Sequence, residues 1–150
     1  MNWKALGSYL SKITFAMILL FLCVACQKEK YHLDIYYAKT CPVCRSLMNT
    51  VIDEVKDKYE DEIKVRYHDI DEEASRDCYA KTCSLLEDYY LTEDSGEIPF
   101  LVFDGYFAKV GYNIVERDEI LKLIDDVVQG QDISTELSDF YYFKEGQTLY

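Results

Sequence analysis

Two cysteines separated by two residues, Cys41 and Cys44, carry the clearest chemical signal in the sequence. They follow a strand-like run at residues 33–37 and open a segment whose apolar side chains recur at helical spacing, namely Leu47, Met48, Val51, Ile52, Val55 and Tyr59. Cys41 should therefore lie at the start of a helix, where unpaired N–H groups and the helix dipole favour a thiolate over a thiol. This placement predicts redox chemistry, and the alternatives are an ordinary structural disulfide or half of a zinc site.

The two cysteines are expected to play different parts. Cys41 is the candidate nucleophile, and Cys44, one turn later on the apolar side of the helix, is the partner that resolves a mixed disulfide. Pro42 suits the first helical turn because it has no N–H to lose there. Lys39 and Arg45 flank the pair in an otherwise acidic protein, so their positive charges should favour the Cys41 thiolate further.

With this pair in place, residues 31–130 resemble the thioredoxin-like superfamily. The matching parts beyond the pair are the strand before it, a second strand at 63–71, the dipeptide Ile98-Pro99 and a hairpin-like run at 100–110. In that superfamily the corresponding proline is cis and faces the cysteine pair. The resemblance therefore implies that Pro99 is that proline and that the backbone of Ile98 pairs with an incoming substrate chain. It implies no cofactor.

Some positions depart from the pattern of that superfamily. Thioredoxins place a buried Asp six residues before the first Cys as a proton relay, but here that position is Ile35, with Asp34 on the opposite face of the strand. Thr40 replaces the Trp that usually precedes the first Cys. Gly111-Tyr112 stands where glutaredoxins carry a Gly pair that helps to hold glutathione. The resemblance therefore extends neither to general-base assistance of the thioredoxin type nor to glutathione specificity.

Residues 1–26 have the character of a targeting segment. Two lysines precede an uncharged, almost wholly apolar run at 13–25, which is shorter than the about 20 residues that a transmembrane helix needs. Small residues before Cys26 resemble a bacterial lipoprotein signal, which predicts that Cys26 carries lipid and becomes the new N-terminus. The alternatives are an uncleaved signal anchor and ordinary secretion. All three place the domain outside the cytoplasm, and lipidation would anchor it to the bacterial cell membrane.

The remaining cysteines form a second pair. One of the six cysteines lies in the discarded signal and one would carry lipid, which leaves four in a disulfide-permissive compartment: Cys41, Cys44, Cys78 and Cys83. On an unbroken helix Cys78 and Cys83 would point about 140° apart, so a bridge between them demands a helix break. We expect such a local structural disulfide. A second redox pair that exchanges electrons with the first, or a zinc site using all four thiolates, are the alternatives.

The charge balance limits the class of partner. The formal net charge is −12, and loss of two signal lysines would change 16 basic and 28 acidic residues to 14 and 28, a net charge of −14. Such an acidic domain should bind neither nucleic acid nor an anionic lipid surface, which favours protein partners. His32 and His68 are expected to have structural or surface roles, since no spacing links them to a metal or a nucleophile.

The element order predicts an α/β, thioredoxin-like fold. A chain of 150 residues suits one domain. Strand, helix, strand, helix, hairpin and helix should give a central mixed β-sheet flanked by helices, with an inserted helical segment at 74–91 before the cis proline. Asp104-Gly105 predicts a two-residue hairpin turn, and Asn113 with Glu116 predicts a capping box for the last helix.

The expected organisation follows from these segments. A signal at 1–26 and a short tether at 27–30 precede the thioredoxin-like domain at 31–130, and a tail at 131–150 follows it. The aromatic run at 140–143 in the tail suits either an additional docked element or a partner-binding segment.

These observations predict an extracytoplasmic, membrane-tethered thiol-disulfide oxidoreductase that acts on protein thiols and disulfides and is recycled by a membrane redox partner. Two other classes remain open. One is an accessory protein for peptide export, resembling bacteriocin-transport accessory proteins, in which partner binding matters more than turnover. The other is a metal-binding module that uses the same thiols.

Overall fold

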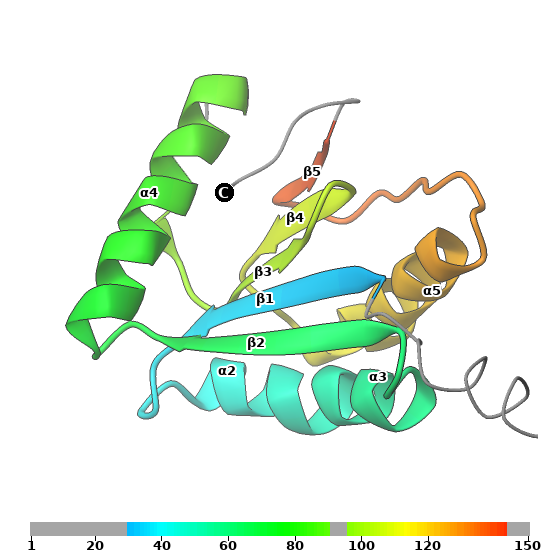
Figure 1. Cartoon of the computed structure of the whole chain (residues 1–150), viewed down its shortest axis with the longest axis horizontal. Helices are drawn as coiled ribbons and strands as arrows, with labels where there is room; N and C mark the ends of the chain where they lie inside the picture. The colour runs from blue at the N-terminus through cyan, green and yellow to red at the C-terminus, as the bar shows by residue number, and fades with distance from the viewer. Residues whose placement is uncertain (1–29, 91–95, 144–150) are drawn as a thin grey trace, which may run out of the picture.

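The computed structural model of the protein describes residues 30–90 and 96–143. Within them, five strands form one mixed sheet in the order β2-β1-β3-β4-β5 (Figure 1). Only β1 and β2 are parallel, and the other neighbouring pairs are antiparallel. The strands are β1 (Tyr31–Tyr37), β2 (Ile63–Asp69), β3 (Phe100–Phe103), β4 (Phe107–Val110) and β5 (Phe140–Tyr142).

Helices cover the two faces of this sheet. After a turn at 38–41, the chain is helical without interruption, as α2 (Pro42–Leu47), a π-helical turn η1 (Met48–Ile52) and α3 (Asp53–Lys58). The connection from β2 to β3 contains α4 (Glu73–Tyr90), and a 3-10 turn η3 (Ile114–Glu116) leads into α5 (Arg117–Val128). α2, α3 and α5 pack on one face of the sheet, and α4 lies on the other (Figure 1).

Successive side chains of β1 point to opposite faces of the sheet and so contribute to two separate hydrophobic cores. Leu33 and Ile35 face the first core, which α2, η1, α3 and α5 complete, whereas Tyr36 faces the second core beside α4. Asp34 shares the second face, as the alternation predicts. The first core includes Leu47, Val51, Ile52, Val55, Leu101, Phe103, Ile120 and Ile124, and the second includes Leu86, Phe100, Val102 and Val110.

This order of strands and helices is the thioredoxin-like α/β fold expected from the sequence. The inserted helical segment is α4, and it runs without interruption. The structure adds one strand: residues 140–142 of the tail pair antiparallel with β4, so the sheet extends beyond the boundary at 130. The aromatic run of the tail is thus a docked element of the same sheet.

Local signals for turns and caps correspond to observed geometry, with one difference. Asn113 and Glu116 form the expected capping box, here at the start of η3. The β3–β4 hairpin has a three-residue loop, because Phe103 pairs with Phe107. Gly105 in that loop has a φ of 76°, which glycine adopts without steric cost. The expected two-residue turn is therefore wrong by one residue.

The predicted targeting segment lies outside the described residues. This applies to residues 1–26, to the lipidation site Cys26 and to most of the tether. In the described ranges, no helix is both long and apolar enough to cross a membrane.

Candidate active site

Cys41 and Cys44 form a disulfide at the start of α2, shortly after the end of β1. Their Cα atoms are 5.3 Å apart, within the range that a disulfide spans. Cys41 is half-buried, whereas Cys44 is only 1% exposed and belongs to the buried face of α2. An incoming sulfur therefore meets Cys41 first.

The start of α2 provides the electrostatic setting expected for a reactive thiol. Cys41 is the N-cap residue, and its sulfur accepts a hydrogen bond of 3.0 Å from the backbone N–H of Cys44. Pro42 occupies the first turn, which contains no acidic residue. Because the N–H of Cys44 and the positive end of the helix dipole both face the Cys41 sulfur, a thiolate formed there would be stabilised.

Lys39 was expected to favour the Cys41 thiolate, but its charge is paired with carboxylates instead. Its ammonium lies 2.6 Å from a carboxylate oxygen of Asp69 and 4.0 Å from one of Glu72. The Lys39 hydrogen bond, together with one from the backbone N–H of Asp71, holds the pKa of Asp69 below its ordinary value. Lys39 is therefore compensated locally, and its expected contribution to a Cys41 thiolate is reduced.

The Ile98–Pro99 peptide bond is cis, as the resemblance implied. Pro99 is buried, and its carbonyl accepts a hydrogen bond of 2.8 Å from the backbone N–H of Gly111. Ile98 is half-exposed, and no backbone hydrogen bond links it to another residue of the described ranges. As far as residues 30–90 and 96–143 are concerned, the backbone of Ile98 is thus open to an extended chain.

Strand register brings the cis proline to the same end of the sheet as the cysteine pair. Tyr36 near the end of β1 pairs with Phe100, the first residue of β3. Pro99 directly precedes Phe100, and Cys41 follows shortly after Tyr36 in the chain. Antiparallel pairing therefore places both parts of the candidate site at the same end of the sheet, where β1 ends and β3 begins (Figure 1).

Hydrogen bonds link η1 to the β4–α5 connection, and the sequence did not predict them. The hydroxyl of Thr50 donates to the Ser46 carbonyl at 2.7 Å and is hydrogen-bonded to the Tyr112 hydroxyl at 2.8 Å. Arg117 donates through Nε to the Thr50 carbonyl at 3.1 Å. These contacts fix the Gly111-Tyr112 segment against the helix that carries the cysteines, at a π-helical turn that hydrophobic periodicity does not reveal.

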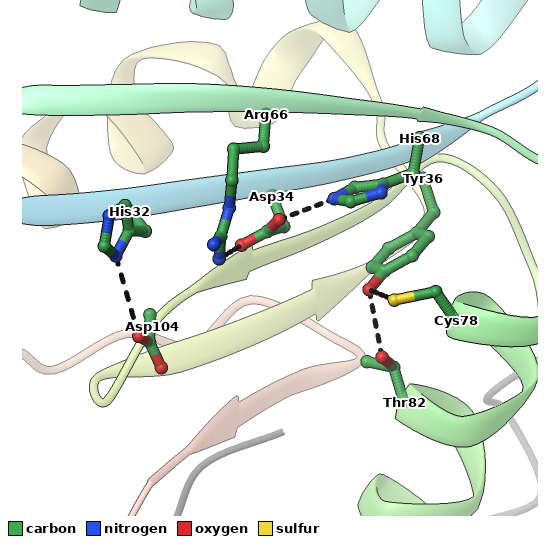
Figure 2. Close-up of polar contacts among 8 residues, drawn as sticks. All are labelled: His32, Asp34, Tyr36, Arg66, His68, Cys78, Thr82 and Asp104. Carbon is green, nitrogen blue, oxygen red and sulfur yellow. Dashed lines mark hydrogen bonds and ion pairs between the residues drawn. The ribbon is translucent and has the colours of Figure 1, made fainter. Parts of the chain in front are cut away.

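The opposite face of the sheet carries a buried polar network (Figure 2). Asp34 is fully buried and pairs with Arg66 and, at 2.6 Å, with Nε2 of His68. The His68 ring stacks on Tyr36 with 4.6 Å between centroids. Burial raises the pKa of Tyr36, and the Cys78 thiol at 3.2 Å contributes to that rise. Thioredoxins carry a proton-relay Asp at the position of Ile35. Asp34 does not replace that carboxylate, because it lies on the sheet face opposite α2.

The expected bridge between Cys78 and Cys83 is absent. Both residues lie on α4, which has no break between them, and neither forms a disulfide. Cys78 is half-buried beside Tyr36, and Cys83 is buried in the second core. α4 lies on the face opposite α2, and no group of three or more His, Cys, Asp or Glu side chains in the described ranges could hold a metal. The four thiols therefore do not form a common site there.

Fold and site together define a protein of the thioredoxin-like fold with a Cys-x-x-Cys disulfide at a helix start and a cis proline at the same end of the sheet. No protein-family profile matches the sequence, and no curated protein matches it. Among solved structures, the chain is similar to thioredoxin O2 from Arabidopsis thaliana in its oxidised state. The two share 22% identity over 71% of this chain and 85% of that chain, with a TM-score of 0.44.

Proposed function

We propose that the protein is a thiol-disulfide oxidoreductase that acts on polypeptide thiols and disulfides through Cys41 and Cys44. The observation that carries this proposal is the asymmetry of the pair: a half-buried Cys41 at a helix start and a buried Cys44 within disulfide distance of it. The open backbone of Ile98 beside the cis peptide bond supports a polypeptide as the substrate.

In the reducing direction the reaction has two exchange steps. The Cys41 thiolate attacks one sulfur of a substrate disulfide, which forms a mixed disulfide and releases the other substrate sulfur as a thiolate that takes up a proton. Cys44 then loses its proton and attacks the Cys41 sulfur, which breaks the mixed disulfide and releases the second substrate sulfur. The substrate gains two electrons and two protons, and the Cys41–Cys44 pair loses them. The same steps in reverse oxidise a substrate dithiol.

We also place this activity outside the cytoplasm, at the bacterial cell membrane. The composition of residues 1–26 and the small residues before Cys26 support export and lipid attachment. A membrane electron carrier would then recycle the Cys41–Cys44 pair, since the domain binds no cofactor in this scheme. The reduction potential decides the direction: about −270 mV is typical of a reductant and about −120 mV of an oxidant.

Turnover of a disulfide substrate by cysteine variants tests the activity. We expect Cys41→Ser to lower the rate by at least about 100-fold, because the nucleophile is lost. Cys44→Ser should retain the first step and accumulate a mixed disulfide with the substrate, visible as an increase in protein mass. Cys78→Ser is the matched control and should stay within about twofold of the parent.

Three outcomes distinguish the alternatives. A Cys41→Ser protein as fast as the parent contradicts the proposed mechanism. A Cys78→Ser protein as slow as Cys41→Ser would favour electron exchange between two cysteine pairs. A parent that does not turn over disulfides but binds a peptide exporter would favour the accessory role.

A further inference from the structure

The segment that would align the substrate is anchored on two sides. We define the cis-proline loop as residues 96–99. The backbone N–H of Gly111 donates to the Pro99 carbonyl at 2.8 Å, and the hydroxyl of Tyr79 donates to the Glu97 carbonyl at 3.2 Å. Ile98 lies between these two carbonyls. The Tyr79 hydrogen bond therefore acts on the peptide plane that joins Glu97 to Ile98.

Tyr79 is itself held by buried aromatic side chains. It lies in the first half of α4, and its ring contacts Phe100 edge-on, with centroids 6.1 Å apart, and Tyr36 at 5.5 Å. Phe100 and Tyr36 are both fully buried in the second core. The Tyr79 hydroxyl is thus presented to the cis-proline loop from a packed position.

The Tyr79 hydroxyl stays protonated and can therefore act as a hydrogen-bond donor. Burial raises the pKa of Tyr79 above its ordinary value, and the neighbouring Cys83 thiol adds to the rise. The hydroxyl therefore keeps its proton throughout the physiological pH range. A protonated phenol that donates to a backbone carbonyl is a fixed constraint rather than a titrating one.

We propose that Tyr79 is a positioning residue, whose hydroxyl orients the Glu97–Ile98 peptide so that the backbone of Ile98 is preset to pair with an extended polypeptide substrate. This inference rests on the proposed function. It gives the inserted helix α4 a part in substrate recognition, although the helix lies on the sheet face opposite the cysteine pair. A small disulfide that does not pair with Ile98 gains nothing from this constraint.

Tyr79→Phe tests the inference because it removes only the hydroxyl. For the purified full-length protein, we expect the KM for the disulfides of insulin to rise about 3- to 10-fold, the effect of one net hydrogen bond, with kcat within about twofold. Both parameters for hydroxyethyl disulfide should remain unchanged. Tyr90→Phe, the same substitution on the same helix, is the control, since the Tyr90 hydroxyl has no hydrogen-bond partner among the described residues.

Hydrogen exchange of the backbone gives a second readout that does not depend on turnover. Peptides that cover residues 96–103 should exchange faster in Tyr79→Phe, whereas peptides from α4 should exchange as in the parent. An unchanged KM for insulin, or equal changes for both substrates, overturns the positioning role and leaves the proposed function intact. A parent protein that reduces neither substrate overturns the proposed function, and this inference with it.

Discussion

At the scale of single residues, Lys39 beside the cysteine pair forms its ion pair with a carboxylate far away in the sequence. Lys39 is bound by Asp69, and the stabilisation of a Cys41 thiolate is left chiefly to the N–H of Cys44 and the dipole of the helical segment. The side chain of Asp69 is nearly inaccessible, so its ion pair belongs to the folded state alone. This makes the acid stability of the protein depend on Lys39.

Lys39→Gln should reduce the loss of stability on acidification. The hydrogen bond from Lys39, with that from the Asp71 N–H, holds the pKa of Asp69 low, so the folded state takes up a proton there less readily than the unfolded chain. The resulting stabilisation is complete above the ordinary pKa of an Asp and is lost as the pH falls through the lower folded value. The free energy of unfolding should therefore fall less in the variant between about pH 7 and about pH 2.

Urea unfolding at a series of pH values measures this difference. Lys81→Gln is the control, since Lys81 is an exposed lysine of α4 and its removal should leave the pH profile as in the parent. If Lys39→Gln and the parent lose stability in parallel, Lys39 does not hold the pKa of Asp69 low.

The residues that could be predicted from the sequence are those whose chemistry is local. Cys41 and Cys44 were identifiable from spacing and a helix start, whereas Pro99 was identified only through the resemblance to the thioredoxin-like superfamily. The partners of Lys39 and Tyr79 were not, because Asp69 and Glu97 reach them only through strand register and helix placement. The same holds for a carboxylate such as Asp34, whose partners lie on a neighbouring strand.

At the scale of elements, the tail is the part whose role the sequence left open. β5 pairs with β4, and Phe140 stacks on the fully buried Phe107 with 4.8 Å between ring centroids. Phe140 also contacts Tyr142 edge-on at 4.9 Å. β5 thus covers an edge of the sheet that would otherwise expose the backbone groups of β4. Aromatic content alone did not distinguish this docked strand from a partner-binding segment.

Phe140→Ala should therefore destabilise the whole domain. The side chain is half-buried, so we expect a loss on the order of 2 kcal/mol in the free energy of unfolding, below the about 3–5 kcal/mol of a fully buried Phe. Val115→Ala is the control, because Val115 is 83% exposed and its truncation should change stability by less than about 0.5 kcal/mol. Denaturant unfolding followed by circular dichroism measures both. Equal stability of Phe140→Ala and the parent would mean that β5 does not contribute to the fold.

α4 and η1 show why a correct element order still leaves the site incomplete. The position of α4 in the chain was predictable, but an unbroken helix excluded the bridge expected between Cys78 and Cys83. Helical spacing after Cys44 continues through η1, so periodicity gave no sign of the π-helical turn or of the Thr50–Tyr112 contact. Both features depend on packing between elements, which a periodic pattern does not contain.

At the scale of the whole molecule, the chain enters the sheet at the end opposite the cysteine pair. The N–H groups of Lys30 and Tyr31 both donate to the Glu62 carbonyl at 3.0 Å, beside the start of β2. Cys41 follows the other end of β1, and seven strand residues separate the two ends by roughly 20 Å. An attachment before Lys30 therefore leaves the candidate active site at the end of the domain remote from that attachment.

Cys26→Ser tests the proposed attachment. If Cys26 carries the lipid and becomes the new N-terminus, the variant made in a bacterial host that processes lipoproteins should lose the lipid mass and keep residues 1–25 uncleaved. Its turnover of hydroxyethyl disulfide should stay within about twofold of the parent, because the site lies at the opposite end of β1. Mass spectrometry of the N-terminal peptide measures the first two effects, and a turnover assay measures the third.

Cys23→Ser is the matched control, three residues earlier in the same segment. Cys23 is discarded with the signal in the lipoprotein scheme, so this variant should stay on the membrane with its lipid. A membrane-bound parent that keeps residues 1–25 and carries no lipid would instead support an uncleaved signal anchor, and a parent found only in the soluble exported fraction would support ordinary secretion. Because both variants replace a thiol by a hydroxyl within the same segment, a difference in lipid mass between them assigns the lipid to Cys26 rather than to another cysteine of the segment.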